Sequence, residues 1–230
     1  MICWSCEKAA GVGEFCAACG ALQPPDRAID HFAVLGVAPG FAVDLGDLER
    51  RYKDAARRLH PDKFVRSDPR ARRASLARSV QLNDAWKALR DPVKRAEYLL
   101  SLAGIEVGGE EGTTRQRPAG AESADGPGAT REKVPVPQHL LLDVLELREG
   151  LLDARAEGDD EEVRRLTAQV RERRGAAMAN VAAAFAAVPA DIDGAASELV
   201  AVRYFDRFLA EVALGESVDA EVSTGSNHAG

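Results

Sequence analysis

The sequence predicts an all-α protein in which a helical hairpin and a C-terminal antiparallel three-helix bundle follow a small zinc knuckle segment. Three observations support this fold class. Apolar residues recur at helical spacing over residues 30–102 and 138–214. Asp, Gly and Pro stand where such helices would begin and end. All four cysteines lie within residues 1–19, so they form a local cluster and not a set of disulfides spread along the chain.

The composition narrows the class of function. At 230 residues the chain is long enough for two small hydrophobic cores. Its formal net charge of −7 and pI near 5.3 disfavour a protein that mainly binds nucleic acid, because neutralising phosphates needs a basic surface. No run of about 18 apolar residues is present, and the opening Met1-Ile2-Cys3-Trp4 lacks the features of a signal peptide. We therefore expect a cytoplasmic protein.

A metal site is the first element expected, in residues 1–24. Its ligands are two Cys-x-x-Cys pairs, Cys3 with Cys6 and Cys16 with Cys19. Four thiolates form the closed tetrahedral shell that structural zinc prefers, and so short a segment would gain most of its folding free energy from the metal. An iron–sulfur cluster on the same thiolates is the alternative. Redox chemistry is disfavoured because a Cys-x-x-Cys redox motif belongs to a βαβ context.

Four helices are expected between residues 28 and 107. They cover residues 30–35, 44–60, 71–90 and 92–102. Gly36 ends the first, Pro61 follows the second, and Pro92 suits the first turn of the fourth. The apolar members of the third helix are Val80, Leu82, Ala85, Trp86 and Leu89.

The second of these helices has two different faces and ends in a charged loop. Its apolar face carries Leu48, Tyr52, Ala55, Ala56 and Leu59, and its basic face carries Arg50, Lys53 and Arg57. Pro61 disfavours α-helical geometry at His60, so His60-Pro61-Asp62-Lys63 is expected in a loop. Local chemistry allows a binding loop or a solvated helix end capped by His60. An enzyme is disfavoured because the sequence places no nucleophile or phosphate-binding loop with these residues.

The order of these motifs resembles a J-domain, the co-chaperone module that stimulates ATP hydrolysis by DnaK-type chaperones. The segments that carry the resemblance are Phe32-x-x-Leu35-Gly36, His60-Pro61-Asp62-Lys63-Phe64, Leu82-Asn83-Asp84-Ala85-Trp86 and Leu89-Arg90-Asp91-Pro92. It implies that the charged loop contacts the chaperone and is needed for ATPase stimulation. The basic face, Arg50, Lys53 and Arg57, would then dock on an acidic patch of the chaperone. Such charge pairs favour fast, weak and salt-sensitive association.

Three further helices are expected in the C-terminal half, over residues 138–157, 160–187 and 192–214. Short turns join them, which predicts an antiparallel bundle. The first helix carries two apolar stripes where one would suffice. The first stripe is Leu140, Val144, Leu147 and Leu151, and the second is Leu141, Leu145 and Leu152, flanked by Leu142. The second stripe is either buried inside the bundle or exposed as a partner-binding patch.

Two segments narrow the resemblance to HscB, a J-protein of iron–sulfur cluster assembly. They are Arg95-Ala96-Glu97-Tyr98-Leu99-Leu100-Ser101-Leu102 and Leu145-Glu146-Leu147-Arg148-Glu149. The resemblance extends to HscB forms with an N-terminal tetracysteine segment. It implies an HscA-like ATPase as the chaperone partner and an IscU-type scaffold protein bound by the bundle. The scaffold-binding residues it implies are Leu141, Leu142, Leu145, Glu146, Arg148, Glu149 and Tyr204.

This interpretation gives the chain five segments. They are a zinc segment over 1–24, a J-domain over 28–107, a flexible linker over 108–137, a scaffold-binding bundle over 138–215 and a disordered tail over 216–230. The linker is rich in Gly, Pro, Thr, Ala and Glu, with too little apolar area to offset the entropy of ordering. Three alternatives stay open: a general J-protein for another client, a zinc-ribbon nucleic-acid module and a thiol oxidoreductase.

Overall fold

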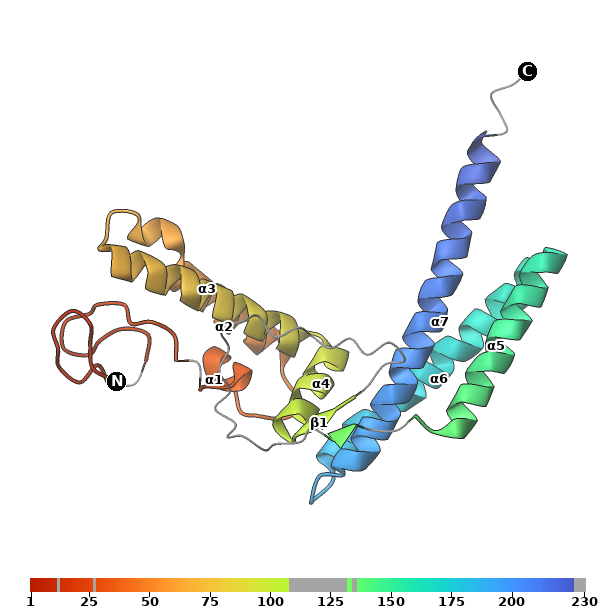
Figure 1. Ribbon diagram of the computed structural model, residues 1–230, viewed down its shortest axis with the longest axis horizontal. Helices are drawn as coiled ribbons and strands as arrows, with labels where there is room; N and C mark the ends of the chain where they lie inside the picture. The colour runs from red at the N-terminus through yellow and green to blue at the C-terminus, as the bar shows by residue number, and fades with distance from the viewer. Residues whose placement is uncertain (12, 27, 108–131, 134–135, 226–230) are drawn as a thin grey trace. The chain divides into compact units, whose positions relative to one another are not determined.

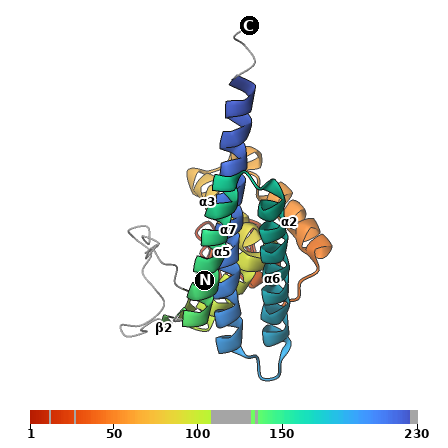
Figure 2. The ribbon, with the colours of Figure 1, turned by 90° about the vertical axis from the view of Figure 1, so that its right-hand side faces the viewer.

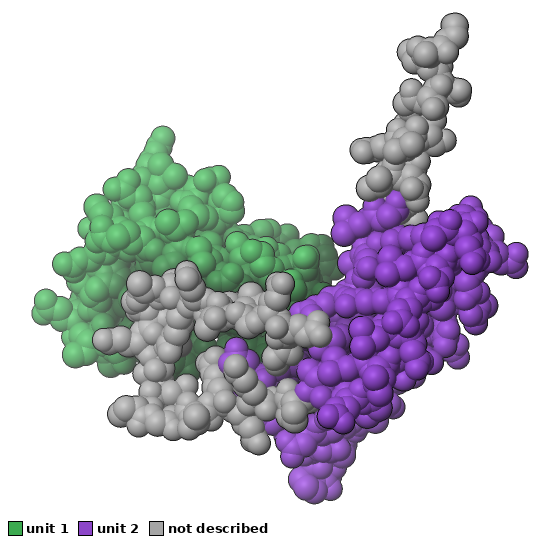
Figure 3. All heavy atoms as spheres, turned by 45° about the vertical axis from the view of Figure 1, so that its right-hand side comes forward, with its two compact units in different colours: residues 1–98 green, residues 99–230 purple. Residues whose placement is uncertain are grey.

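The computed structural model describes residues 1–11, 13–26, 28–107, 132–133 and 136–225, with the backbone alone for 132–133 and 216–225 (Figure 1). The chain divides into two compact units, Met1–Tyr98 and Leu99–Gly230, which Figure 3 colours separately. Both units are built from helices, so the predicted fold class is confirmed. Among the described residues, no helix has the length and apolar character needed to span a bilayer.

Unit 1 contains the four helices that the sequence predicts, together with one short turn of 3-10 helix. They are α1 (His31–Leu35), α2 (Leu45–Leu59), η1 (Pro61–Phe64), α3 (Pro69–Arg90) and α4 (Pro92–Leu102), the last of which crosses the border between the units. Asp30, Asp44 and Asp68 cap three of them by accepting hydrogen bonds from backbone amides of the first turn. The Asp68 cap and Pro69 explain why α3 begins earlier than the apolar pattern indicates.

The helices α2 and α3 form the hairpin that holds the core of unit 1. Its large buried side chains include Phe32, Leu48, Leu59, Leu82 and Leu89. The ring of Tyr52 on α2 stacks on Trp86 of α3 with centroids 4.9 Å apart, and the Tyr52 hydroxyl donates to Asn83. Val80, one of the apolar members of α3, lies outside this core and is 53% exposed. Two residues turn a helix by more than half a circle, so Val80 and buried Leu82 face opposite sides.

Unit 2 is a three-helix bundle, seen side on in Figure 2. Its helices are α5 (Gln138–Glu157), α6 (Asp160–Ala186) and α7 (Ile192–Gly225). Gly158 adopts a left-handed conformation that ends α5, and the Asp159 carboxylate accepts from the first amides of α6, which gives the short predicted turn. The core takes one stripe from α5, Leu140, Val144, Leu147 and Leu151, and packs it with Val170, Val181, Leu199 and Phe208.

Two regions differ from a purely helical description. Strand β1 (Ile105–Glu106) pairs in parallel with β2 (Glu132–Lys133), so a two-residue ladder joins the residues just before the predicted linker to residues in its last part. Most of that linker, residues 108–131 and 134–135, lies outside the described residues. The backbone of α7 continues to Gly225, through most of the range for which the sequence predicts a disordered tail. No proline or glycine lies between Glu216 and Thr224 to stop the helix, and residues 226–230 lie outside the described residues.

Candidate functional site

The charged loop follows α2 directly and forms η1. At His60 the backbone leaves helical geometry with ψ of 129°, as the following proline requires. The His60 ring accepts a hydrogen bond through Nδ1 from the Asp62 amide at 3.3 Å, and the Lys63 amide donates to the His60 carbonyl at 3.0 Å. The side chains of His60 and Asp62 remain 57% and 85% exposed. The backbone of the loop is therefore fixed while its charged groups face solvent.

The basic face of α2 is exposed but less positive than the sequence suggests. Arg50, Lys53 and Arg57 have side chains that are 68%, 62% and 75% exposed. Each forms an ion pair with a carboxylate one turn earlier on the helix, at Asp47, Glu49 and Asp54 respectively. Exposed pairs within a helix contribute only about 0.3–0.5 kcal/mol. These cations can therefore exchange their local partners for acidic groups of another protein at small cost.

The second apolar stripe of α5 proves to be largely exposed. Leu142, Leu145 and Leu152 are 61%, 53% and 61% exposed, whereas Leu141 is half-buried. Glu146 and Glu149 stand beside them and are also exposed. We name Leu142, Leu145 and Leu152 the leucine patch. Periodicity alone left two interpretations of this stripe, and the exposures favour the partner-binding patch.

Two of the residues that the resemblance implies in scaffold binding, Arg148 and Tyr204, are less exposed than the leucine patch. Arg148 is half-buried and forms an ion pair with Glu211 of α7 at 3.3 Å. Tyr204 is only 3% exposed within the bundle, with the guanidinium of Arg207 5.8 Å from its ring. The structure therefore does not bring Tyr204 onto the same surface as the leucine patch. The resemblance implied that Tyr204 is a contact residue, but an aromatic side chain also suits a bundle core.

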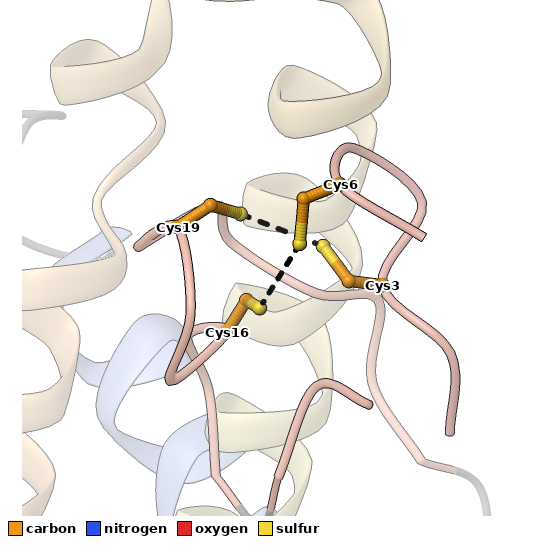
Figure 4. Close-up of side chains that lie close together, drawn as sticks. All are labelled: Cys3, Cys6, Cys16 and Cys19. Carbon is orange, nitrogen blue, oxygen red and sulfur yellow. Dashed lines mark hydrogen bonds between the residues drawn. The ribbon is translucent and has the colours of Figure 1, made fainter. Parts of the chain in front are cut away.

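The four cysteines converge in space, as Figure 4 shows. We call residues 1–24 the tetracysteine lobe. The sulfur of Cys3 lies 3.7 Å from that of Cys19, the sulfurs of Cys6 and Cys16 are 3.8 Å apart, and all four lie within 4.8 Å of one another. Zn–S bonds of about 2.3 Å in a tetrahedron would separate the sulfurs by about 3.8 Å. The lobe therefore fits a four-coordinate metal ion.

The electrostatics of the lobe also suit a cation. Burial opposes ionisation of Cys3, but hydrogen bonds from the backbone of Cys6 and Ser5, together with those from the thiols of Cys16 and Cys19, lower the pKa of the Cys3 thiol to about 6. At Cys6, a backbone hydrogen bond from Lys8 favours the thiolate, but burial and the neighbouring sulfurs together raise the pKa to about 11. Thiolates this close repel one another, so a cation is needed to hold all four ionised.

Each half of the lobe is a knuckle closed by one bridge between backbone segments. Ile2 pairs with Ala9 around the first Cys-x-x-Cys, and Phe15 pairs with Leu22 around the second. The apolar cluster inside is small and consists mainly of Cys3, Ala10 and Cys16. With so small a core, the binding of a metal ion by the four cysteines becomes the chief source of stability in this segment.

Comparisons with known proteins agree with this division of the chain. Residues 30–98 match the DnaJ domain family, and residues 136–213 match the family described as the HSCB C-terminal oligomerisation domain. A mouse protein named iron-sulfur cluster co-chaperone protein HscB is 33% identical over 219 residues, which cover 94% of this chain and 82% of the mouse protein. This chain belongs to the HscB family of iron–sulfur cluster co-chaperones.

Other HscB proteins extend the comparison. An Arabidopsis thaliana HscB homolog is 30% identical over 172 residues, which cover 74% of this chain and 58% of that protein. The crystal structure of human co-chaperone protein HscB superposes with a TM-score of 0.74 at 28% identity, covering 93% of this chain and 98% of the human one. The J-domain and the HscB-type C-terminal domain predicted from the sequence are thus confirmed.

Proposed function

We propose that this HscB-family protein couples an HscA- or DnaK-type chaperone to an IscU-type scaffold protein. The loop His60–Lys63 and the basic face of α2 would bind the chaperone and stimulate its ATPase, while α5 would hold the scaffold. The observation that carries the proposal is the coexistence of two exposed surfaces of different chemistry in two separate units. One is charged and suits a salt-sensitive contact, and the other is apolar with an acidic border and suits a more persistent one.

The chaperone half of the proposal depends on His60. In the loop its ring accepts from the Asp62 amide, so the side chain stabilises the conformation in which Asp62 is presented. We expect His60→Gln to abolish stimulation in a steady-state ATPase assay of the chaperone and to leave scaffold affinity unchanged. Gln at this position has a different shape and lacks the ring nitrogen at the Nδ1 position. Full stimulation by the variant would contradict the proposal.

The scaffold half depends on the leucine patch. We expect Leu142→Ala combined with Leu145→Ala to weaken scaffold binding by about tenfold or more, because central apolar contacts each contribute about 1 kcal/mol or more. Both side chains are exposed, so the bundle should remain folded. Leu102→Ala is the matched control, since Leu102 is a 52% exposed leucine outside the bundle helices. Unchanged calorimetric affinity in the double variant would point to another client, as in a general J-protein.

We also propose that the tetracysteine lobe holds zinc in a structural role. The sulfur separations near 3.8 Å support a tetrahedral ion, and four thiolates match zinc better than harder cations. Bound zinc would supply fixed geometry and charge neutralisation to the four thiolates. Metal analysis of the purified protein tests the assignment, and a coloured preparation with iron and inorganic sulfide would favour a cluster instead.

A further inference from the structure

Three arginines from the α2–α3 hairpin contact the tetracysteine lobe. Arg58 of α2 forms an ion pair with Glu14 at 3.2 Å. The Nε of Arg78, on α3, donates to the carbonyl oxygen of Gln23 at 2.6 Å. Its Nη2 donates to two more carbonyls of the lobe, those of Gly13 at 3.3 Å and Pro24 at 3.0 Å. Arg70 of α3 reaches the carbonyl of Trp4 at 3.4 Å. The lobe is thus attached to both helices that flank the charged loop.

Arg78 is the most buried of these three contacts. Burial lowers the pKa of Arg78, although Glu14 and Asp26 act against that effect. A guanidinium removed from water needs hydrogen-bond acceptors, and Arg78 obtains all of its assigned acceptors from residues 13–24. If those carbonyls are not held in place, a partly buried cation loses its partners. The conformation of α3 at this point therefore depends on the fold of the lobe.

Gln23 joins this contact to the metal site. Its side chain is 2% exposed, and its Nε2 group donates to the sulfur of Cys3 at 3.3 Å and to the Ala21 carbonyl at 2.8 Å. Its own carbonyl is the closest acceptor of Arg78. One residue therefore contacts a metal ligand with its side chain and the hairpin with its backbone.

The stretch of α3 around Arg78 also holds the end of α2. The hydroxyl of Ser75 donates to the Leu59 carbonyl at 2.6 Å, and that of Ser79 donates to the same atom at 3.4 Å. Leu59 is the last residue of α2 and directly precedes His60. A shift of α3 at Ser75 and Ser79 would therefore displace the start of the charged loop.

Polar contacts contribute to holding the lobe against the hairpin. A cavity of about 490 Å³ lies between them, lined on the lobe side by residues such as Met1 and Gln23 and on the hairpin side by Leu59, Arg78 and Leu82. An incompletely packed interface forgoes much of the dispersion energy of a protein core. The strength of this interface then depends on whether the folded lobe holds its carbonyl oxygens within reach of Arg78. The fold of the lobe depends in turn on the bound metal.

We propose that the tetracysteine lobe is a metal-dependent brace on the α2–α3 hairpin, with Gln23 and Arg78 as the positioning residues that couple metal binding to the order of the charged loop. The proposal concerns this chain alone and holds whether or not the loop acts on an HscA-type chaperone. By thermodynamic linkage, the coupling is reciprocal: a change that weakens the brace must also weaken metal binding.

The test is amide hydrogen exchange of the full-length protein, compared between the zinc-loaded and chelated forms. Chelation is expected to speed exchange about tenfold in peptides covering residues 55–67 and 69–80, as suits a typical coupling between sites, and to leave peptides of α5 and α6 unchanged. In Arg78→Lys, which keeps the charge but lacks the planar fork, exchange in the hairpin should no longer respond to chelation. Arg73→Lys, at an exposed arginine of the same helix, should respond as the natural chain does.

A second readout follows the metal directly. Zinc competition with a chromogenic chelator should show several-fold weaker binding to Arg78→Lys and unchanged binding to Arg73→Lys. If chelation leaves exchange in the hairpin of the natural chain unaltered, the brace is overturned. If Arg78→Lys responds fully and binds zinc normally, the role of Arg78 is overturned. Should Arg78→Lys fail to fold, Gln23→Leu decides, because a full hairpin response in that variant would contradict the coupling.

Discussion

The imidazole of His31 lies against the ring of Tyr98, with ring centroids 4.2 Å apart. The backbone amide of His31 donates to the Tyr98 hydroxyl at 2.9 Å. Burial lowers the pKa of His31, although Asp84 and Asp30 partly oppose this. The environment of this side chain therefore favours the neutral ring. A neighbour 67 positions away in the chain sets that environment, which is why the residue type alone did not reveal it.

This gives the stability of unit 1 a pH dependence. An unfolded His31 has a pKa near 6.5 and takes up a proton first, so unit 1 should lose stability as pH falls below about 6.5 and through the lower folded pKa. His31→Phe keeps the stacking and removes the titration, and it should flatten this fall. Urea midpoints at pH 7.5 and 5.5, measured with chelator present to remove metal effects, test the prediction. An equal fall in His31→Phe would show that other groups are responsible.

Glu7 has a left-handed backbone conformation, and a glycine occupies the equivalent position in the second half of the lobe. Glu7, directly after Cys6, has φ of 60°, and Gly20, directly after Cys19, has φ of 72°. A left-handed conformation costs a non-glycine residue about 1 kcal/mol or more. We expect Glu7→Gly to tighten zinc binding by about fivefold in chelator competition, and Gly20→Ala to weaken it similarly. Within the part of the chain that the structure describes, no atom lies within 4 Å of a Cβ at Gly20, so the second change tests backbone strain alone. Equal affinities would rule out such strain.

At the scale of elements, helix α5 carries a glycine that costs stability. Gly150 lies within α5, and a Cβ built there would meet Leu166 of α6 at an ordinary contact distance of 3.6 Å. Alanine should therefore fit, and Gly150→Ala should stabilise the bundle by about 1 kcal/mol. Gly175→Ala in α6, where a Cβ would meet no atom of the described residues within 4 Å, is the matched comparison and should stabilise similarly. A loss of stability in Gly150→Ala alone would indicate that α5 and α6 pack more closely here.

Elements were predictable from the sequence where local signals decide them. Asp44 and Asp159 cap helices close to where the sequence predicts the helices to begin, because an N-cap needs only the next three amides. The apolar pattern missed the Asp68 cap, which starts α3 earlier than predicted. The exposure of the second stripe on α5 was not predictable, since the periodicity of apolar residues does not show how many other helices pack against a helix. The contact between Arg58 and Glu14 was also out of reach, because 44 positions separate the two residues.

At the scale of the whole molecule, the chain has two separate cores. The core of unit 1 is built on the α2–α3 hairpin, and that of unit 2 on three bundle helices. The sequence indicated this division through its two periodic regions and the segment rich in Gly and Pro between them. It also places both tryptophans, Trp4 and Trp86, in unit 1. Tryptophan fluorescence therefore reports on unit 1 alone, whereas circular dichroism at 222 nm reports on helices of both units.

Two cores imply two unfolding transitions that respond to different changes. Leu151→Ala removes a fully buried side chain from α5 and should cost about 2–5 kcal/mol, which would lower the transition of unit 2 by roughly 10 °C or more. The fluorescence transition should not move. Metal chelation should do the reverse, lowering the fluorescence transition and leaving unit 2 unaffected. If Leu151→Ala shifts both signals together, the two units fold as one cooperative body and are energetically coupled.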